Sequence, residues 1–213
     1  IMPLQNRVTP FGEIIANPAR GTFFGNRGGR IHDPATKTLT KRRWASRQWI
    51  ICVLDFKNRQ REVMGNSYTE LFFLDEVTAL AAGHRPCFEC RRTAAKAFFA
   101  ANHAFNAKYP GSMFADKPLR APEMDMILHI ERTSTDEKSP LVPSECPDGT
   151  VFDVDGDAWA VRDGRLLRWT SAGYDRAIPV KGIGGHRVLT PMTTLCNLQH
   201  GYEPTWHESA DTI

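Results

Sequence analysis

The spacing of apolar and polar positions divides the chain into strand-like and helix-like segments. Residues 49–54 form a short apolar run rich in β-branched side chains, which predicts a buried strand with a returning strand at 61–64. Residues 71–74 predict another strand. A short helix follows, with Asp75 placed as its N-cap and Gly83 as its stop.

Longer helical patterns lie in the middle and near the end of the chain. Residues 94–105 place several phenylalanines on one face behind Thr93, a suitable N-cap. Pro122 opens a second pattern, since proline is favoured in the first turn of a helix. A last helix is predicted between Thr190 and the stop signal Gly201.

A regular pattern of short strands precedes that last helix. Apolar runs at 150–154, 158–161 and 165–169 are separated by the dipeptides at 155–156 and 163–164, both Asp-Gly. Two Asp-Gly turns between short alternating runs predict an antiparallel β-meander.

Cys87 and Cys90 follow Pro86 as a Cys-x-x-Cys, the most specific chemical pattern in the sequence. This spacing lets two thiolates meet one metal ion. A redox pair and two unrelated thiols are the alternatives. A redox pair usually follows a strand in a thioredoxin-like βαβ unit, and no βαβ pattern surrounds Cys87. We therefore predict half of a zinc site, with Cys52 as the best upstream partner and His32, beside Asp33, as a further candidate ligand.

The segment 71–92, and above all the run Ala-Leu-Ala-Ala-Gly-His-Arg-Pro-Cys-Phe-Glu-Cys at 79–90, resembles the second half of the zinc module of the Ada DNA-repair proteins. The resemblance covers roughly a tenth of the chain and implies zinc-ligand roles for Cys87 and Cys90. In that family an earlier cysteine pair completes the site, and one of those thiolates accepts a methyl group from a damaged DNA phosphate. Here the only upstream cysteine is Cys52, so the methyl-acceptor role has no clear equivalent.

Charge is distributed unevenly along the 213 residues. Residues 1–61 hold 12 lysines and arginines against 3 acidic residues, a net charge of +9, whereas the remainder carries −6. A basic, Gly-rich N-terminal segment is typical of contacts with phosphate backbones, and a solvated arm is the alternative. Arginine can bind phosphate and tryptophan can stack on a base. The candidate nucleic-acid-binding residues are Arg27, Arg30, Arg42, Arg43, Trp44, Arg47, Arg85, Arg91 and Arg92.

Three side chains are candidates for acid-base chemistry. Glu70 lies between a polar loop and a predicted strand, where it could act as a general base or stay a surface carboxylate. Asp125 and His129 share a helix face, so the carboxylate could orient the imidazole or merely form a surface hydrogen bond. His207 follows a helix, Gly, ring, charge, Pro sequence similar to the one before Cys87.

Composition limits the classes of protein that need consideration. The apolar content of 41% is ordinary for a globular chain. No apolar run approaches the ~18 residues of a membrane span, so no membrane partner is expected. The start of the sequence lacks the apolar core of a signal peptide. Five cysteines, an odd number, favour a reducing cytoplasm over a disulfide scaffold.

The sequence therefore predicts an α+β protein with a treble-clef-like zinc-containing region (hairpin, Cys-x-x-Cys turn, helix) and a small antiparallel meander with a C-terminal helix. The expected function is a zinc-containing nucleic-acid-binding protein that acts on damaged or modified DNA, in preference to RNA. The alternatives are a metal-dependent or DNA-processing enzyme (nuclease or glycosylase), with three protein ligands and a water on zinc, and a zinc-stapled protein-interaction module. The predicted regions are a basic arm at 1–40, a metal-binding α/β region at 41–132, a linker at 133–149 and the meander unit at 150–213.

Overall fold

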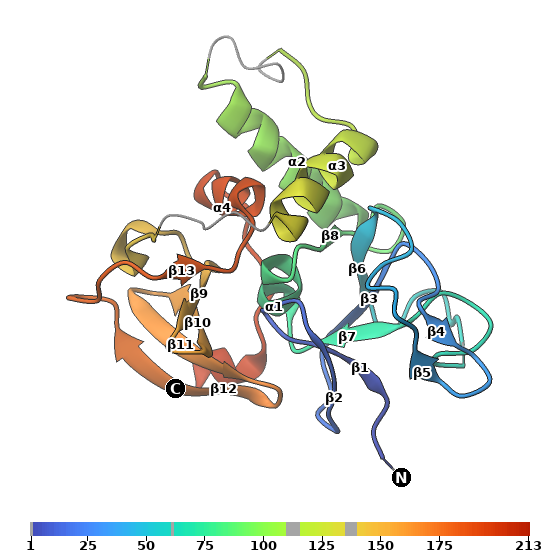
Figure 1. Ribbon diagram of the computed structural model, residues 1–213. Coiled ribbons are helices and arrows are strands. Elements are labelled where there is room, and N and C mark those ends of the chain that lie inside the picture. Colours follow the sequence, from blue (N-terminus) through green and yellow to red (C-terminus); the bar gives the residue numbers. More distant parts are fainter. Residues whose placement is uncertain (1, 61, 110–115, 135–139) are drawn as a thin grey trace.

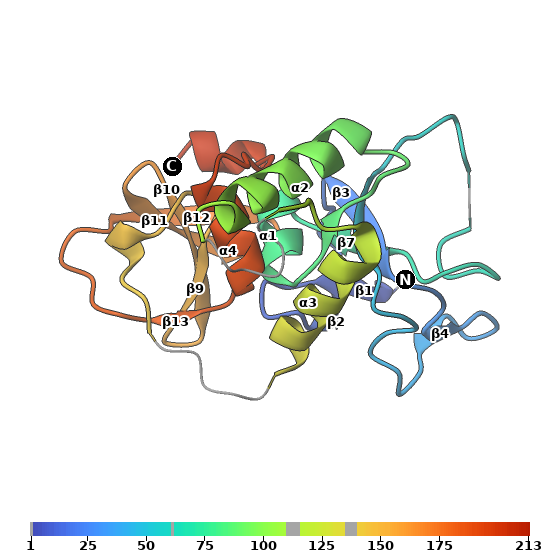
Figure 2. The same cartoon turned by 90° about the horizontal axis from the view of Figure 1, so that it is seen from above.

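The chain folds as an α+β protein around two large sheets (Figure 1). The computed structural model describes residues 2–60, 62–109, 116–134 and 140–213, and within these residues it has four α-helices. Viewed from above in Figure 2, the helices α2, α3 and α4 lie over one side of the molecule. The predicted fold class is confirmed at this level.

The first sheet has six strands, and three of them come from the segment expected to be a basic arm. These segments form strands of the sheet because alternate side chains, such as Val8 and Phe23, enter the core. The arm at 1–40 is thus part of the folded body, with a further small hairpin of β4 (His32–Asp33) and β5 (Thr38–Leu39). In spatial order the six strands are β2 (Ile14–Ala16), β1 (Gln5–Val8), β7 (Leu71–Phe73), β3 (Phe23–Arg27), β6 (Trp49–Val53) and β8 (Arg85–Pro86).

Strand β6 is where the sequence predicts it, but its partners are different. It pairs antiparallel with β3 and parallel with β8, and residues 62–64 form no strand, so the predicted hairpin with 61–64 is wrong for its described part. Gly25 allows β3 to approach β6 closely, since a Cβ atom at this position would lie 1.9 Å from the carbonyl oxygen of Ile50. Residue 61 lies outside the described residues.

The four helices begin and end close to the predicted positions, but Thr190 is not the N-cap of the last one, which begins after Pro191. Asp75 caps α1 by accepting a hydrogen bond from the backbone N–H of Thr78 at 2.8 Å, and Gly83 ends the turn with φ of 83°. The predicted cap Thr93 lies inside its helix, which begins one residue earlier. The helices are α1 (Glu76–Ala81), α2 (Arg92–Asn106), α3 (Ala121–Thr133) and α4 (Met192–Gln199).

The second sheet confirms the predicted meander and extends it. Gly156 and Gly164 adopt φ of 89° and 70° in the two turns, a conformation that glycine adopts without steric cost. Two further strands flank the three predicted ones. In spatial order the strands are β12 (Gly173–Pro179), β11 (Arg165–Thr170), β10 (Asp157–Arg162), β9 (Val151–Val154) and β13 (Arg187–Val188). The described part of the predicted linker holds the short helix η1 (Pro143–Glu145), and η2 (Glu208–Asp211) ends the chain.

Helix α1 joins the two halves of the molecule, and all six of its residues are buried (Figure 1). Leu80 packs into the core under the first sheet, while Val77 packs into the core of the meander. The carboxylate of Glu76 accepts hydrogen bonds from Arg91, Tyr202 and the backbone of Thr205. The region around the Cys-x-x-Cys is therefore fixed to the C-terminal unit by buried polar contacts as well as by apolar packing.

The imidazole of His84, directly after this helix, is completely buried. Its ring lies 4.7 Å from that of Phe73 and 5.0 Å from that of Trp49, and among the described residues neither ring nitrogen has a hydrogen-bond partner. Burial, with the nearby charges of Arg27 and Arg132, holds the pKa of His84 well below its usual value. The ring is therefore neutral in the folded protein.

This buried histidine makes stability depend on pH. Because the unfolded chain takes up a proton near pH 6.5 and the folded chain does not, acidification from pH 7.5 to 5.5 costs about 1.4 kcal/mol at this residue. The backbone of Ala79 and Ala82 raises the pKa of His84, an effect smaller than that of burial. Neither ring nitrogen forms a hydrogen bond with the described residues. We expect His84→Phe to lose this share of the pH dependence in urea unfolding, and an unchanged pH slope would contradict the assignment.

Candidate metal centre

One cysteine of β6 and two of the turn after β8 meet at the edge of the first sheet where these strands pair. Cys52 lies on β6, Cys87 directly follows β8, and Cys90 lies in the turn before α2. Their sulfur atoms all lie within 4.8 Å of one another, and the three form a group that could hold a metal ion. The pairing of β6 with β8 brings this about, because residue 51 is aligned with Pro86 and the following residues of both strands are then neighbours.

Backbone contacts hold the turn that carries two of these thiols. The N–H of Cys87 donates to the carbonyl oxygen of Ile51 at 3.0 Å, and the N–H of Glu89 donates to the Cys87 sulfur at 3.3 Å. Hydrogen bonds with Cys52 and Cys90 lower the pKa of the Cys87 thiol, and the contact with Cys87 raises the pKa of Cys52. The protonation of each thiol therefore depends on the other two.

The donor set fits a soft or borderline metal ion such as zinc. Thiolates bind zinc at about 2.3 Å, so the sulfurs of a tetrahedral site lie about 3.8 Å apart, within the limit set by the observed group. Only the three cysteines belong to this group among the described residues. Three protein ligands with a remaining position are typical of catalytic zinc sites, whereas structural sites usually have four.

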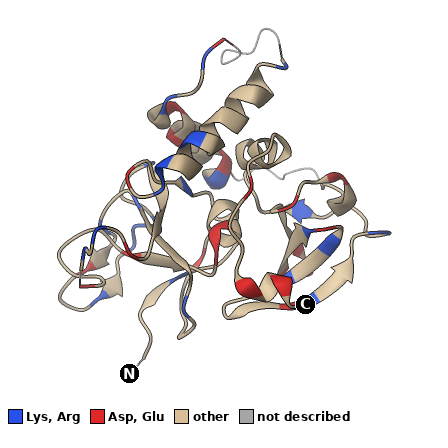
Figure 3. Cartoon of the chain, turned by 180° about the vertical axis from the view of Figure 1, so that it is seen from behind, with Lys and Arg blue, Asp and Glu red and all other residues tan. Residues whose placement is uncertain are grey.

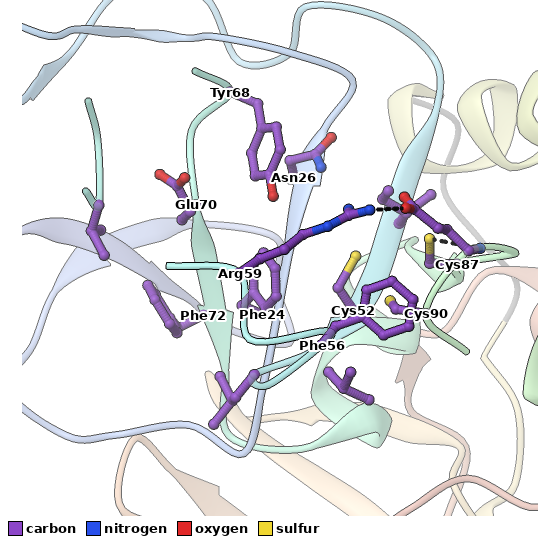
Figure 4. Close-up of a pocket in the computed structure, with 15 residues that line it drawn as sticks. Phe24, Asn26, Cys52, Phe56, Arg59, Tyr68, Glu70, Phe72, Cys87 and Cys90 are labelled. Carbon is purple, nitrogen blue, oxygen red and sulfur yellow. Dashed lines mark hydrogen bonds and ion pairs between the residues drawn. The ribbon is translucent and has the colours of Figure 1, made fainter. Parts of the chain in front are cut away.

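A cavity of about 210 Å³ adjoins the cysteines (Figure 4). Its floor is one face of the sheet, where Phe24 of β3 is aligned with Cys52 on one side and Phe72 of β7 on the other. The alternate residues, such as Phe23 and Ile51, point to the opposite face and into the core. Period-two alternation therefore separates an apolar core face from a face that lines the cavity.

Two polar side chains lie in the cavity wall beyond this aromatic floor. Glu70 is 4% exposed, and its Oε2 atom accepts from the N–H of Met64 at 2.8 Å. Its Oε1 atom is buried and has no hydrogen-bond partner among the described residues. Asn26, on the neighbouring strand, accepts from the N–H of Gly28 through Oδ1, so its Nδ2 group is the end that remains for a ligand.

The rim of the cavity is closed on one side by an ion pair. Arg59 donates to Glu89 at 2.6 Å and connects the loop after β6 to the Cys-x-x-Cys turn (Figure 4). Phe56 and Tyr68, from the same long connection, complete the aromatic lining. Both partners of the ion pair are substantially exposed, so the contact contributes little to stability.

The structure separates the cysteines from the histidines proposed as ligands or catalysts. His32 binds the Thr69 hydroxyl at 2.6 Å and the carbonyl of Gly65 at 2.8 Å, outside the cysteine group. His207 caps η2 and contacts Ser209. Glu70 is the one predicted catalytic residue that lines the cysteine cavity.

The predicted pairing of Asp125 with His129 is wrong. Both carboxylate oxygens of Asp125 accept from Arg85, at 2.7 and 2.8 Å, in a buried ion pair. His129 instead packs edge-on against Trp44 and lies 3.3 Å from Arg132. The helix spacing allowed the first pairing, but the tertiary fold supplies a stronger, bidentate partner.

The predicted nucleic-acid-binding residues fall into two groups. The side chains of Arg85 and Arg91 are largely covered and are bound to Asp125 and Glu76, and Arg27 is buried. The other six are exposed, and four of them lie in the irregular segment between β5 and β6: Arg30, Arg42, Arg43, Trp44, Arg47 and Arg92. Lysines and arginines are spread over both halves of the molecule, as Figure 3 shows.

Sequence reasoning missed Asn26, Arg59 and the aromatic floor of the cavity. The alternation of side chains along residues 23–27 could have predicted a strand that places Phe24 and Asn26 on one face. The surrounding glycines and arginines obscured this pattern. Arg59 belongs to a loop, where no periodic pattern indicates direction.

No protein-family model, curated protein or solved structure matches this chain. Within the described residues, the helices are all too short or too polar to cross a membrane. The chemical assignment therefore depends on the site itself.

Proposed function

We propose that this protein is a zinc-dependent enzyme that acts on a single base-sized group, such as a damaged or modified base of DNA. One observation carries the proposal: a group of three cysteines borders a cavity whose wall also holds a buried carboxylate with an unshared oxygen. Buried polar groups without partners are rare in purely structural sites and are concentrated where a ligand supplies the partner.

The residues that would hold zinc are Cys52, Cys87 and Cys90. When bound by three thiolates, zinc supplies a Lewis acid with a position open to substrate or water. The antiparallel β3 and β6, the Cys-x-x-Cys turn and α2 follow in the order of a treble-clef-like unit, which we propose as the framework of this centre. Free thiols of this kind favour a reducing compartment such as the cytoplasm.

The cavity itself favours a flat substrate with hydrogen-bond donors. Phe24 and Phe72 line it with aromatic rings, and a cavity of about 150 Å³ is known to accept a benzene ring, so about 210 Å³ suits one small ring system. The free oxygen of Glu70 can accept an N–H group of the substrate or take up a proton from it. The Nδ2 group of Asn26 can donate to a carbonyl or ring nitrogen.

Glu70 and the cysteines stand at opposite ends of this cavity. Glu70 precedes β7, Cys52 lies on β6, and β3 separates the two strands. Neighbouring strands are about 4.8 Å apart, so the two groups are separated by about 10 Å across the sheet. Glu70 would therefore bind the far edge of a substrate whose near edge faces the cysteines.

The experiment incubates zinc-loaded protein with nucleobases, nucleosides and oligonucleotides that contain modified bases, and detects conversion by mass spectrometry. We expect one of these classes to be converted. Glu70→Gln should lower the rate about 10²–10⁴-fold while the zinc content stays unchanged, because the glutamine oxygen can still accept from the N–H of Met64.

Glu62→Gln is the matched control, since Glu62 is exposed, binds Lys37 and lies outside the cavity. It should convert substrate like the unmodified protein. Conversion by none of the substrates, or equal rates with Glu70→Gln, would overturn the proposed activity.

A second candidate function is nucleic-acid binding in which zinc is only structural. The exposed basic and aromatic residues at 42–47 favour it, and the resemblance of 71–92 to the Ada zinc module supports DNA as the nucleic acid. This function predicts affinity for DNA that falls steeply with salt and is insensitive to Glu70→Gln. An affinity that does not depend on salt would argue against it.

A further inference from the structure

A second cavity, of about 540 Å³, lies at the opposite face of β3 and β6 from the cavity beside the cysteines. The two cavities share no lining residue. Four arginines line the second cavity: Arg27, Arg43, Arg132 and Arg187. They come from β3, the segment before β6, α3 and β13, so the tertiary fold gathers them from four separate parts of the chain.

Two of these arginines converge on one tryptophan. The Cζ atom of Arg27 lies 4.0 Å from the ring centre of Trp49, and the Cζ atom of Arg132 lies 3.9 Å from it. Because both Cζ atoms lie within 4.0 Å of the same ring centre, the two guanidinium groups are themselves close neighbours. Cation–π contact with the ring partly offsets their desolvation, but the ring carries no net charge to balance theirs.

Neither of these two arginines has a carboxylate partner among the described residues. Arg27 donates to the carbonyl oxygens of Gly12 and Arg43, at 2.8 and 3.5 Å. Arg132 donates to the carbonyl oxygens of Gly83 and Arg47, at 2.9 and 2.6 Å. The Nε atom of each is buried and has no hydrogen-bond partner in the part of the chain that the structure describes.

The acidic groups close to this cavity are already engaged. Glu131, which lines it, accepts from the backbone and hydroxyl of Thr193 at the start of α4. Asp153 accepts from Arg187 at 2.6 Å. Asp125, which lies near Arg132, is bound on both oxygens by Arg85. Among the described residues, the cavity is thus left with a surplus of positive charge.

We propose that this cavity is a binding site for the phosphate group of a small molecule, such as a nucleotide or free pyrophosphate. Guanidinium groups bind phosphate oxygens through paired N–H donors, and a buried cation without a partner is costly. A phosphate in this cavity would supply the partner that Arg27 and Arg132 lack. Arg43, exposed at the edge, would add a third charge from the solvent side.

The titration of the two buried arginines agrees with this geometry. Burial lowers the pKa of Arg27 to about 9, helped by the charges of Arg43 and Arg132, and burial lowers the pKa of Arg132 to about 9. Both remain charged at neutral pH, where a phosphate group is also charged. The phosphate group would be bound by charge-assisted hydrogen bonds from both guanidinium groups.

The test measures binding of pyrophosphate, inorganic phosphate and a single-stranded oligonucleotide to the zinc-loaded full chain by titration calorimetry. We expect pyrophosphate to bind and to raise the unfolding temperature. Arg43→Ala should weaken pyrophosphate binding about tenfold or more, the loss of one charge-assisted contact. Arg42→Ala removes the same charge from the adjacent exposed residue, which does not line the cavity, and should leave binding unchanged.

Arg27→Met provides a second variant of similar length, which should abolish binding; if it fails to fold, the Arg43→Ala and Arg42→Ala pair decides. Absence of pyrophosphate and phosphate binding, or equal weakening by Arg42→Ala and Arg43→Ala, would overturn the proposal. So would oligonucleotide binding that Arg27→Met abolishes and pyrophosphate does not displace, because the cavity would then bind a polymer and not a small phosphate. Glu70→Gln should bind pyrophosphate normally, which separates this site from the proposed enzyme activity.

Discussion

Cys87→Ser is expected to abolish stoichiometric zinc binding and to lower the unfolding temperature more than any other single cysteine change. The Cys87 sulfur lies within 4.8 Å of both other sulfurs, and the Cys87 backbone is fixed to β6 by the hydrogen bond to Ile51. Structural zinc contributes apparent binding energies of about 10–16 kcal/mol in small zinc domains, so losing a ligand has a large effect. Metal affinity should fall at least about 100-fold, beyond the loss seen for residues that only support a ligand.

Cys196→Ser is the matched control, because Cys196 on α4 has the same exposed fraction as Cys87, 8%, and lies outside the cysteine group. It should keep one zinc ion per chain by elemental analysis. X-ray absorption of the zinc-loaded protein should show three sulfur neighbours at about 2.3 Å and one lighter atom. Full zinc content in Cys87→Ser would refute the centre, and a fourth protein ligand would exclude direct catalysis by the metal.

The second large effect is expected at the ion pair of Arg85 with Asp125. The side chain of Arg85 is 1% exposed, and two parallel hydrogen bonds of 2.7 and 2.8 Å join it to the carboxylate. Asp125→Ala leaves a guanidinium buried without its partner, which costs about 3–5 kcal/mol in unfolding free energy. Because Arg85 pairs with β6 two residues before Cys87, zinc affinity should fall as well.

The control for this prediction is Asp175→Ala, which breaks an equally bidentate but exposed pair with Arg168. Exposed pairs contribute little, so chemical denaturation should show no more than a small change. The double variant Arg85→Met with Asp125→Leu should recover most of the lost stability, because an apolar pair can replace a buried ion pair. A cost of Asp125→Ala no larger than that of Asp175→Ala would contradict the role of burial.

Both predictions depend on contacts that no local pattern contains. Asp125 and His129 are four residues apart on a helix, and that spacing predicted a pair between them. The fold instead brings Arg85, forty positions earlier in the sequence, against the same carboxylate. Likewise the helix–Gly–ring–charge–Pro turn before His207 resembled the one before Cys87, yet the structure places His207 at η2.

The sequence alone was sufficient to predict those features that depend on a few neighbouring residues. The cap Asp75, the stop Gly83, the two Asp-Gly turns and the strand at 49–53 follow from hydrogen-bonding capacity, allowed backbone angles and apolar periodicity within a few residues. The Cys-x-x-Cys belongs with these features, since its spacing is a local property.

Only the tertiary structure decided which distant segments became neighbours. Pairing of β6 with β8 brings Cys52 to the Cys-x-x-Cys, and pairing of β7, β3 and β6 brings Glu70 and Asn26 into the same cavity. The physical reason is that strand pairing and burial are selected by the packing of the whole core, which no single window contains. The same packing made the segment expected to be a basic arm into three strands of the first sheet and a small hairpin, and it buried Arg27.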